Sequence, residues 1–337
     1  MNIENVIIPE GYKSKNSLIE TEVHIKKIKD FFERALAESL NLTRVSAPLF
    51  VEPQTGMNDN LNGSERPVSF DVLATGKDVQ IVHSLAKWKR YSLYRYGFNV
   101  GEGLYTDMNA IRRDEDLDNL HSIYVDQWDW EKIINKEDRN LNTLKDVVKK
   151  IYTVFKKAED YACKESMDEE KFLPEEIFFI TTQELEDMYP GKTAKEREDL
   201  IAKEKGAVFI MQIGDILKSG EKHDGRSPDY DDWTMNGDII FYYPILDRAF
   251  EVSSMGIRVD EKALLRQLKE ANCEDRKNLE FHKMLLEGKL PYTIGGGIGQ
   301  SRICMFFLKK AHIGEVQASI WDEKNLVACE NHGIRLL

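Results

Sequence analysis

Cysteine is scarce in this sequence, with four residues in a chain of 337. They are Cys163, Cys273, Cys304 and Cys329, and no two of them form a CxxC pair or a metal-like cluster. This wide spacing argues against a disulfide framework and against a thiolate metal site. The pattern is typical of reduced thiols, and we expect a cytoplasmic protein.

Long apolar runs and an excess of positive charge are also missing. No stretch approaches the length of a membrane span, and residues 1–17 lack the basic start and apolar centre of a signal peptide. The formal net charge is −12, so the chain lacks the broad positive field that attracts polyanions. We therefore expect neither a membrane nor a nucleic acid as the main partner, although a local basic patch stays possible.

The chain shows no internal repeat and no low-complexity linker, which favours one domain over residues 1–337. Residues 1–16 form an N-terminal extension. Ser17 and Glu20 then make a capping box ahead of a long amphipathic helix. The segment 167–206 is rich in acidic residues and lysine, and we predict that it is peripheral.

The most informative stretch is Gly295 to Arg302, GGGIGQSR. It follows a β-favouring run and opens an apolar helical pattern, so the glycines are predicted to form a loop at a strand-to-helix junction. Such a loop suits an anion or nucleotide, because the helix start offers free N–H groups and a positive dipole. Neither the dinucleotide fingerprint nor the phosphate-loop motif fits. A glycine-rich turn with a surface arginine is an equally good interpretation of this stretch alone.

The segment 122–130 is predicted to be a strand with Gln127 and Asp129 on one face. A strand with charge on both faces borders a polar cavity or is an edge strand with one wet side. The segment 54–66 is a polar loop, long enough to serve as a mobile lid. The segment 223–233, HDGRSPDYDDW, is predicted to be another polar loop.

Two acidic residues are predicted to lie side by side on a hairpin. Asp238 to Tyr242 and Ala249 to Ser253 are two short strands joined by a turn, which brings Asp238 close to Glu251. Magnesium takes one or two carboxylates together with phosphate oxygens. A magnesium and triphosphate site is therefore one interpretation, and two solvent-facing acids on a hairpin are the other. Similarly, Arg112 either holds a phosphate or belongs to a charged surface turn.

Several of these residues together resemble the class II aminoacyl-tRNA synthetases. Gly297 to Arg302 is similar to their third motif, and Arg112 with the following strand is similar to their second. Val45-Ser46-Ala47-Pro48 resembles the first motif, which lies at the dimer interface in that family. His83 to Lys89 resembles a segment of the aspartate and asparagine enzymes. The resemblance implies an α+β fold in which helices flank an antiparallel sheet, and a homodimer.

A narrower resemblance covers most of the chain, from about Val45 to Arg302. It is carried in order by the segments HSLAKWKR, GEGLYT, YVDQWDWE, SPDYDDW, NGDI, SSMGIRVD and GGGIGQSR. These segments are similar to the ammonia-dependent, AMP-forming asparagine synthetases, or aspartate ammonia ligases. That family implies a ligase that makes asparagine from aspartate, ammonia and ATP through an aspartyl-adenylate, with magnesium and with release of AMP and pyrophosphate.

The resemblance also implies roles for individual residues. The implied aspartate-binding residues are Ser84, Lys89, Gln127, Asp129, Ser253, Ser254 and Arg258. The implied ATP-binding residues are Arg112, Arg226, Asp231, Asp238, Gly297, Gly299 and Arg302, with Asp238 and Glu251 on magnesium. The implied catalytic residues are Lys89, Arg112, Arg302 and Asp59, of which Asp59 would receive ammonium and take its proton. Arg112 is preferred to Arg113 because it keeps the spacing to the next strand. Between Trp233 and Asn236 the chain is shorter than the family leads us to expect.

Three rival functions can be weighed on the sequence. A glutamine-dependent enzyme needs an activated cysteine, and Cys163 and Cys304 lie on apolar helical patterns instead. A tRNA ligase needs an anticodon-binding domain, for which the segments before the first helix and after Arg302 leave no room. A catalytically silent, amino-acid-binding regulator would have lost the phosphate arginines or the acids, and all are present.

Overall fold

A sheet of eight strands forms the centre of the molecule, in the order β3-β7-β8-β13-β12-β11-β10-β9. The computed structural model describes residues 2–3, 6–61 and 65–337. All neighbouring strands pair antiparallel except at the two edges, where β3 with β7 and β9 with β10 are parallel. The strands are β3 (Leu42–Arg44), β7 (Gly103–Ile111), β8 (Tyr124–Ile133), β9 (Phe178–Thr181), β10 (Ala207–Met211), β11 (Asp231–Tyr243), β12 (Arg248–Arg258) and β13 (Thr293–Gly299).

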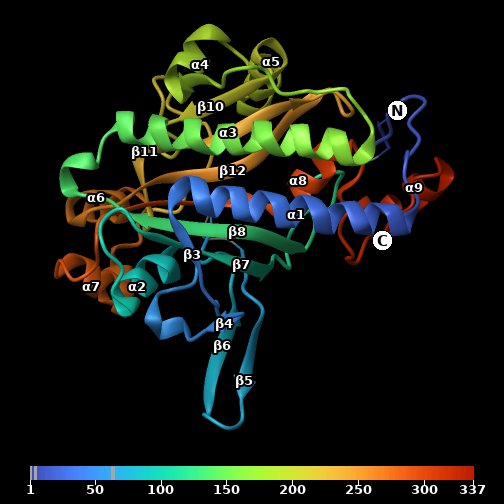
Figure 1. Ribbon diagram of the computed structural model, residues 1–337. Helices are drawn as coiled ribbons and strands as arrows, with labels where there is room; N and C mark the ends of the chain where they lie inside the picture. Colours follow the sequence, from blue (N-terminus) through green and yellow to red (C-terminus); the bar gives the residue numbers. More distant parts are fainter. Residues whose placement is uncertain (1, 4–5, 62–64) are drawn as a thin grey trace.

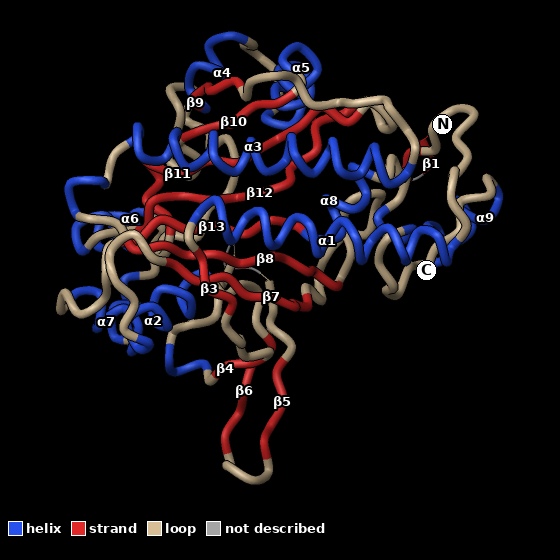
Figure 2. Tube along the Cα trace, viewed as in Figure 1, coloured by secondary structure: helices blue, strands red, loops and turns tan. Residues whose placement is uncertain are grey.

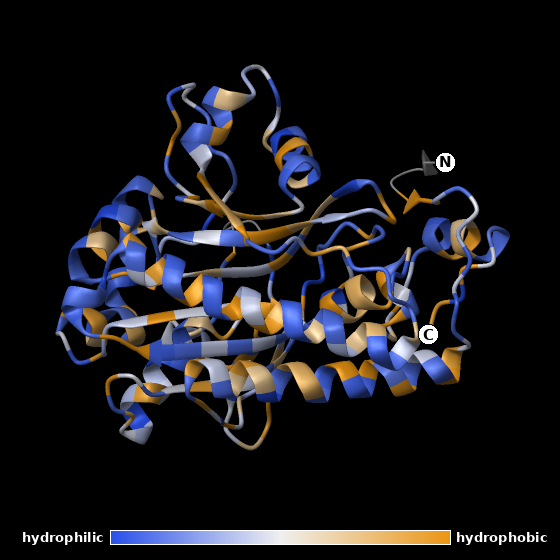
Figure 3. Cartoon of the chain, turned by 45° about the horizontal axis from the view of Figure 1, so that its top comes forward, coloured by the Kyte–Doolittle hydropathy of each residue, from blue (hydrophilic) through white to orange (hydrophobic). Residues whose placement is uncertain are grey.

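Two long helices, α1 (Leu18–Leu40) and α3 (Leu141–Ser166), lie side by side across one face of this sheet (Figure 1). Each mixes hydrophobic and hydrophilic residues along its length (Figure 3), and each buries its apolar side. Phe32 of α1 stacks on Trp128 of β8, with ring centroids 5.0 Å apart. The capping box predicted at the start of α1 is confirmed. Ser17 Oγ accepts a hydrogen bond from Glu20 N, and the Glu20 carboxylate accepts one from Ser17 N.

Shorter elements surround this core (Figure 2). The remaining helices are α2 (Ala86–Tyr96), α4 (Thr182–Met188), α5 (Ala194–Lys205), α6 (Glu261–Glu270), α7 (Glu280–Leu286), α8 (Gln300–Phe307) and α9 (Glu323–Asn331), with 3₁₀ turns at η1 (Pro53–Thr55), η2 (Lys136–Asp138), η3 (Glu274–Asn278) and η4 (Ile313–Glu315). A three-stranded sheet, β4 (Phe50–Val51), β5 (Ser69–Val72) and β6 (Lys77–Ile81), projects from the body as an arm. A small pair, β1 (Asn2–Ile3) and β2 (Val6–Ile7), lies at the N-terminus.

The predicted α+β fold, with helices flanking an antiparallel sheet, is confirmed. The antiparallel hairpin predicted over residues 238–253 is also confirmed, although β11 begins seven residues earlier than expected, at Asp231. The end of the predicted polar loop 223–233 is therefore strand. Residues 274–286 make η3 and then α7. Strand β7 was not predicted.

The glycine stretch was predicted to be a loop, and this prediction is wrong. Residues 293–299 form β13, a central strand paired with β8 on one side and β12 on the other. The strand needs glycine because side chains from its neighbours cross it. A Cβ on Gly295 would lie 2.0 Å from Glu131 Oε2, and a Cβ on Gly297 would lie 2.4 Å from Gln127 Oε1. The prediction that the chain turns into a helix directly afterwards is correct, since α8 begins at Gln300.

Within the described part of the chain, no helix has both the length and the apolar character needed to cross a membrane.

Candidate active site

A polar cavity of about 540 Å³ opens beside β8, β12 and β13. It lies on the face of the sheet opposite to α1, because Gln127 and Asp129 line it while the alternate residue Trp128 packs on α1. In the described wall of the cavity we find every residue that the resemblance assigned to the site, apart from Asp238. These are Asp59, Ser84, Lys89, Arg112, Arg226, Gln127, Asp129, Asp231, Glu251, Ser253, Ser254, Arg258, Gly297, Gly299 and Arg302.

One end of the cavity is built around a buried lysine. Lys89, on α2, lies 3.1 Å from Asp129 Oδ2 and donates a 2.9 Å hydrogen bond to the backbone carbonyl of Gly296. Burial lowers the pKa of Lys89, and the carboxylates of Asp129 and Glu131 oppose that effect. A buried ammonium group next to a carboxylate can bind a small zwitterion such as an amino acid, because it pairs with one end and leaves the carboxylate for the other.

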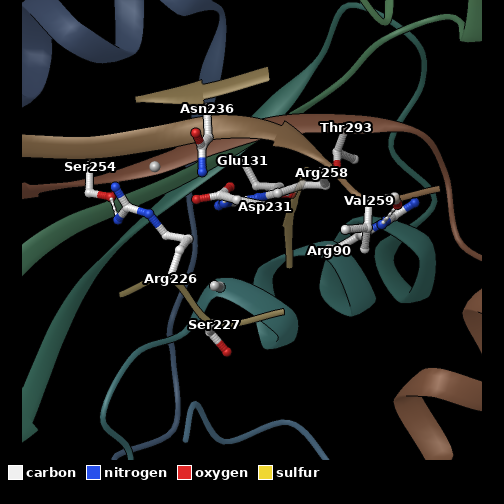
Figure 4. Close-up of polar contacts among 12 residues, drawn as sticks. Arg90, Glu131, Arg226, Ser227, Asp231, Asn236, Ser254, Arg258, Val259 and Thr293 are labelled. Carbon is white, nitrogen blue, oxygen red and sulfur yellow. Dashed lines mark hydrogen bonds and ion pairs between the residues drawn. The ribbon is translucent and has the colours of Figure 1, made fainter. Parts of the chain in front are cut away.

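Arg258 is held between two buried acids on this side of the cavity (Figure 4). Its Nε and Nη2 donate to Glu131, with Nη2 2.8 Å from Oε2, and its Nη1 donates to Asp231. Burial raises the pKa of Glu131, but Arg258 outweighs burial and leaves that pKa below its usual value. For Asp231 burial dominates, and the pKa is raised despite Arg258. The predicted pocket residues Arg258 and Asp231 therefore bind each other.

Glu131 was missed by the sequence analysis. It follows Asp129 by two positions on β8 and is fully buried, where it also accepts a 2.7 Å hydrogen bond from Thr293 Oγ1. The signal was available, because the alternation that placed Gln127 and Asp129 on one face places Glu131 there as well. Its partner Arg258 lies 127 positions away, and no local pattern indicates that pairing.

The other end of the cavity gathers arginines and acids from four segments, the loop before β11, β11 itself, β12 and α8. Arg226 Nη2 donates to Asp238 Oδ1 at 2.6 Å, and Arg226 Nη1 donates to Ser254. Arg302, in the first turn of α8, donates to the Glu251 carbonyl at 2.9 Å and lies 3.8 Å from the Glu251 carboxylate. Burial, opposed by Arg226 and assisted by Glu251, raises the pKa of Asp238 to about 6. The predicted closeness of Asp238 and Glu251 is confirmed, because Glu251 lies opposite Ile240, two residues from Asp238, and its charge contributes to the raised pKa of Asp238.

An irregularity in the β11–β12 hairpin brings both Glu251 and Ser254 to the cavity. Strict alternation would point Glu251 and Ser254 to opposite faces of β12, and yet both line the cavity. The register with β11 shifts between Ile239 and Ile240, where β12 carries one extra residue. A bulge of this kind redirects the side chains that follow it.

Two arginines after β7 share the remaining side of the cavity. Arg112 and Arg113 both line it, and Arg112 lies 3.8 Å from Glu115. Among the described residues nothing accepts a hydrogen bond from the buried Nε of Arg112 or of Arg226. Unpaired, buried guanidinium N–H groups are ready to bind an anion.

Asp59 is buried in the cavity wall rather than exposed on a loop tip. Its carboxylate accepts hydrogen bonds from Ser84 Oγ at 3.1 Å and from Leu61 N at 2.9 Å. His83 Nδ1 lies 3.1 Å from its backbone carbonyl. The polar loop predicted over 54–66 is thus anchored at Asp59, and Asn62-Gly63-Ser64, at the centre of the predicted lid, lie outside the described residues.

A family model described as aspartate-ammonia ligase matches residues 19–333. Relatives of that name share 68% identity over 336 residues in Ruminiclostridium cellulolyticum and 69% over 336 residues in Clostridium perfringens, covering 99% of this chain and 100% of each relative. The chain belongs to the aspartate–ammonia ligase family. The members of this family are enzymes, which explains why the cavity concentrates so many charged side chains.

Solved structures extend the likeness beyond the aspartate–ammonia ligases. Asparaginyl-tRNA synthetase from Pyrococcus horikoshii, complexed with asparaginyl-adenylate, superposes with a TM-score of 0.65 at 16% identity, covering 90% of this chain and 70% of that one. The enzyme from Entamoeba histolytica gives 0.61 at 13% identity, covering 89% and 67%. At these identities the likeness shows the fold, which is that of the class II aminoacyl-tRNA synthetases.

Glu251 in the cavity wall and Asp238 next to it could hold a divalent cation such as magnesium. Across residues 2–3, 6–61 and 65–337 no cluster of three or more metal-ligating side chains occurs. Asp238 and Glu251 provide two, and magnesium in nucleotide sites asks for one or two carboxylates plus phosphate oxygens. Burial is the main cause of the raised pKa of Asp238, and the charge of Glu251 adds to it, an effect that a bound cation would oppose.

Proposed function

We propose that this protein makes L-asparagine from L-aspartate, ammonia and ATP. A side-chain carboxylate oxygen of aspartate attacks the α-phosphorus of ATP, forming aspartyl-adenylate and expelling pyrophosphate. Ammonia then attacks the activated carbonyl carbon, AMP leaves and a proton is released. The observation that carries this proposal is that a polar end, with Lys89 and Asp129, and an arginine-rich end, with Arg226 and Arg302, share one cavity.

The polar end suits aspartate. Lys89 would pair with a carboxylate of the substrate, and Asp129 would take its α-ammonium group. Ser84, Gln127, Ser253, Ser254 and Arg258 would line the same pocket, as the family resemblance implies. Ser253 Oγ is buried and finds no hydrogen-bond partner within the described structure, so it is available to a ligand.

The arginine-rich end suits the triphosphate. Arg112 and Arg302 would bind phosphate oxygens through their N–H forks, and Arg226 would lie near the nucleotide. The resemblance also implies a place near the nucleotide for Asp231, although its carboxylate pairs with Arg258 at the Lys89 end. Asp238 and Glu251 would hold magnesium, which supplies charge neutralisation on the phosphates. Fixed positive groups aimed at the departing pyrophosphate stabilise the charge that develops there.

Asp59 is our candidate for the base that receives ammonium. Ammonia is a nucleophile only after ammonium loses a proton, and a carboxylate within hydrogen-bond reach can take that proton. The buried carboxylate of Asp59 lies beside Ser84, at the end of the cavity assigned to aspartate. We further propose a cytoplasmic homodimer, with residues 45–48 at its interface, on the resemblance to the synthetase family.

The proposed division of labour predicts two different defects. Aspartate-dependent exchange of pyrophosphate into ATP, measured without ammonia, reports adenylate formation alone. Asp238→Ala should abolish this exchange, because the magnesium ion that neutralises the phosphates would lose one of its carboxylate ligands. Asp59→Ala should keep most of the exchange and lose asparagine production by about 10² to 10⁴.

The two variants also have outcomes that would contradict the roles proposed for Asp238 and Asp59. Exchange that persists in Asp238→Ala would remove that residue from the phosphate end. Equal loss of exchange and of asparagine production in Asp59→Ala would remove its role with ammonium. Lys218→Ala serves as the control, because Lys218 is an exposed residue paired with Asp187 and outside the described wall of the cavity.

A further inference from the structure

Helix α5 reaches the cavity from a segment that the sequence marked as peripheral. It begins at Ala194 under a capping box made by Thr193 and Glu196. Ile201 and Ala202, on its apolar side, are completely buried with residues of β10, β11 and β12. Its first turn is therefore held in place by both the cap and the packing, and a side chain on that turn has a fixed point of attachment.

Lys195, the second residue of α5, lines the cavity with 68% of its side chain exposed. It lies where the cavity opens to solvent. Its Nζ is 3.0 Å from Glu198 Oε2, one turn further along the helix. The other oxygen of Glu198 is 3.0 Å from Nε2 of the buried His223. Glu198 therefore has a second partner and would not be left unpaired if Lys195 moved to another anion.

The acids around Lys195 identify which end of the cavity it serves. Helix α5 lies against β12 here, because Asp199 accepts a 2.7 Å hydrogen bond from Ala249 N, two residues before Glu251. The charge of Lys195 accordingly acts on the Glu251 carboxylate, together with that of Arg302. Lys195 also interacts with Asp224, which lines the cavity as well. Lys195 is thus close to the Glu251 and Arg302 end of the cavity, where we place the triphosphate. We do not assign it to the Lys89 and Asp129 end, where we place aspartate.

We propose that Lys195 binds the β- and γ-phosphates of ATP and the pyrophosphate product, exchanging its contact with Glu198 for phosphate oxygens. The proposal rests on the assignment of the Glu251 and Arg302 end to the triphosphate. A lysine ammonium on a flexible stem suits this task, because it acts as a point charge that can follow a leaving group. The arginines of the cavity would bind the α-phosphate.

Binding of three ligands to the full chain tests this, measured calorimetrically with magnesium for ATP, pyrophosphate and AMP. Lys195→Ala should weaken ATP and pyrophosphate about tenfold or more, the effect of one charged hydrogen bond. AMP, which lacks the β- and γ-phosphates, should change less than about twofold in the same scale. Lys195→Arg should keep most of the affinity for ATP and pyrophosphate.

Lys192→Ala is the matched control. Lys192 precedes the same helix and lies 3.0 Å from Glu196, but it is exposed and outside the described wall of the cavity. Equal affinities in Lys195→Ala and Lys192→Ala, or an equal loss for AMP and ATP in Lys195→Ala, would overturn the inference. If Lys195→Ala selectively weakens ATP and pyrophosphate while the unaltered protein shows no aspartate-dependent exchange, the phosphate contact stands and the proposed ligase function fails.

Discussion

Gly295 shows how one residue can serve a site that it does not contact through a side chain. Its missing Cβ leaves room for the carboxylate of Glu131, which would otherwise lie 2.0 Å away, and for Arg258 Nη2, which would lie 2.7 Å away. Glu131 cannot retreat, because Arg258 and Thr293 both bind it in the buried interior. Glycine is thus required by the charged pair behind the cavity.

Gly295→Ala should therefore destabilise the protein by about 1–3 kcal/mol, the usual cost of overpacking a filled core. Urea unfolding followed by circular dichroism measures this difference. Gly299→Ala is the comparison within the same strand, because its Cβ would meet Arg302 Cβ at 3.2 Å and needs only a small adjustment. A Gly295→Ala protein as stable as the unaltered one would contradict the packing described for Glu131.

The raised pKa of Asp238, about 6, gives a pH dependence with a defined sign. The folded state binds this proton more tightly than the unfolded state, so the contribution to stability is present below about pH 4 and is lost as the pH rises through about 6. Magnesium needs the ionised carboxylate. We expect its affinity to fall about tenfold for each pH unit below 6, because one proton must leave before the ion binds.

A magnesium titration at several pH values, read by the thermal midpoint, tests this expectation. Asp238→Asn should bind magnesium more weakly and lose the change of slope near pH 6. Affinity that stays constant from pH 7 to pH 5 in the unaltered protein would show that Asp238 is not a ligand.

At the scale of elements, the amphipathic helices were predictable and the glycine strand was not. The capping box and apolar periodicity of α1 are local signals, and they hold in the structure. Four of the seven residues 293–299 are glycine, which disfavours strands, so Thr293 and Ile294 are the only local signal before the glycines. They become a strand because β8 and β12 pair with them from both sides. In β7, Asp107 and Asn109 interrupt the apolar pattern, so the sequence alone does not predict this strand.

The candidate site also has a part that the sequence predicts and a part that it does not. The resemblance supplied residues that line one cavity, but it could not supply their contacts. The alternation along β8 predicted the polar face with Gln127 and Asp129, whereas the shift in register between Ile239 and Ile240 depends on how two strands pair. The contribution of α5 was equally hidden, because Lys195 looks like any surface lysine until the helix is packed on the sheet.

Asp229 joins several elements behind the cavity. Lys87 of α2 and His282 of α7 each lie 3.0 Å from Asp229 Oδ2, and all three side chains are buried. Arg276 of η3 is 3.4 Å from the same oxygen. Burial would raise the pKa of Asp229, but the charge of Lys87 and the hydrogen bond with His282, assisted by Arg276, outweigh burial and hold that pKa well below its usual range.

Asp229→Ala should lower the free energy of unfolding by about 3–5 kcal/mol, since it leaves the ammonium of Lys87 buried without its partner. The exposed pair of Lys218 and Asp187 is the control, and Lys218→Ala should cost less than about 1 kcal/mol. Urea unfolding of the two variants compares them directly. Similar losses in both would mean that Asp229 does not tie these elements together.

At the scale of the whole molecule, one face of the sheet carries the main hydrophobic cluster, and the other carries the cavity beside smaller clusters such as that of α5. Helices α1 and α3 cover the first face, where Phe32, Trp128 and Phe155 pack together. Charged side chains gather on the second face around the cavity. The organisation of residues 1–337 as one domain stays a prediction, and limited proteolysis that yields no stable fragment would support it.

The central claim is that the two ends of this cavity activate aspartate with ATP and pass it to ammonia. The most direct measurement incubates the purified protein with ATP, magnesium and aspartate, and compares ammonium, glutamine and tRNA as acceptors. The account predicts asparagine and AMP in equal amounts with ammonium, and little product with glutamine or tRNA. Formation of ADP in place of AMP, or transfer of the aspartyl group to tRNA, would contradict it.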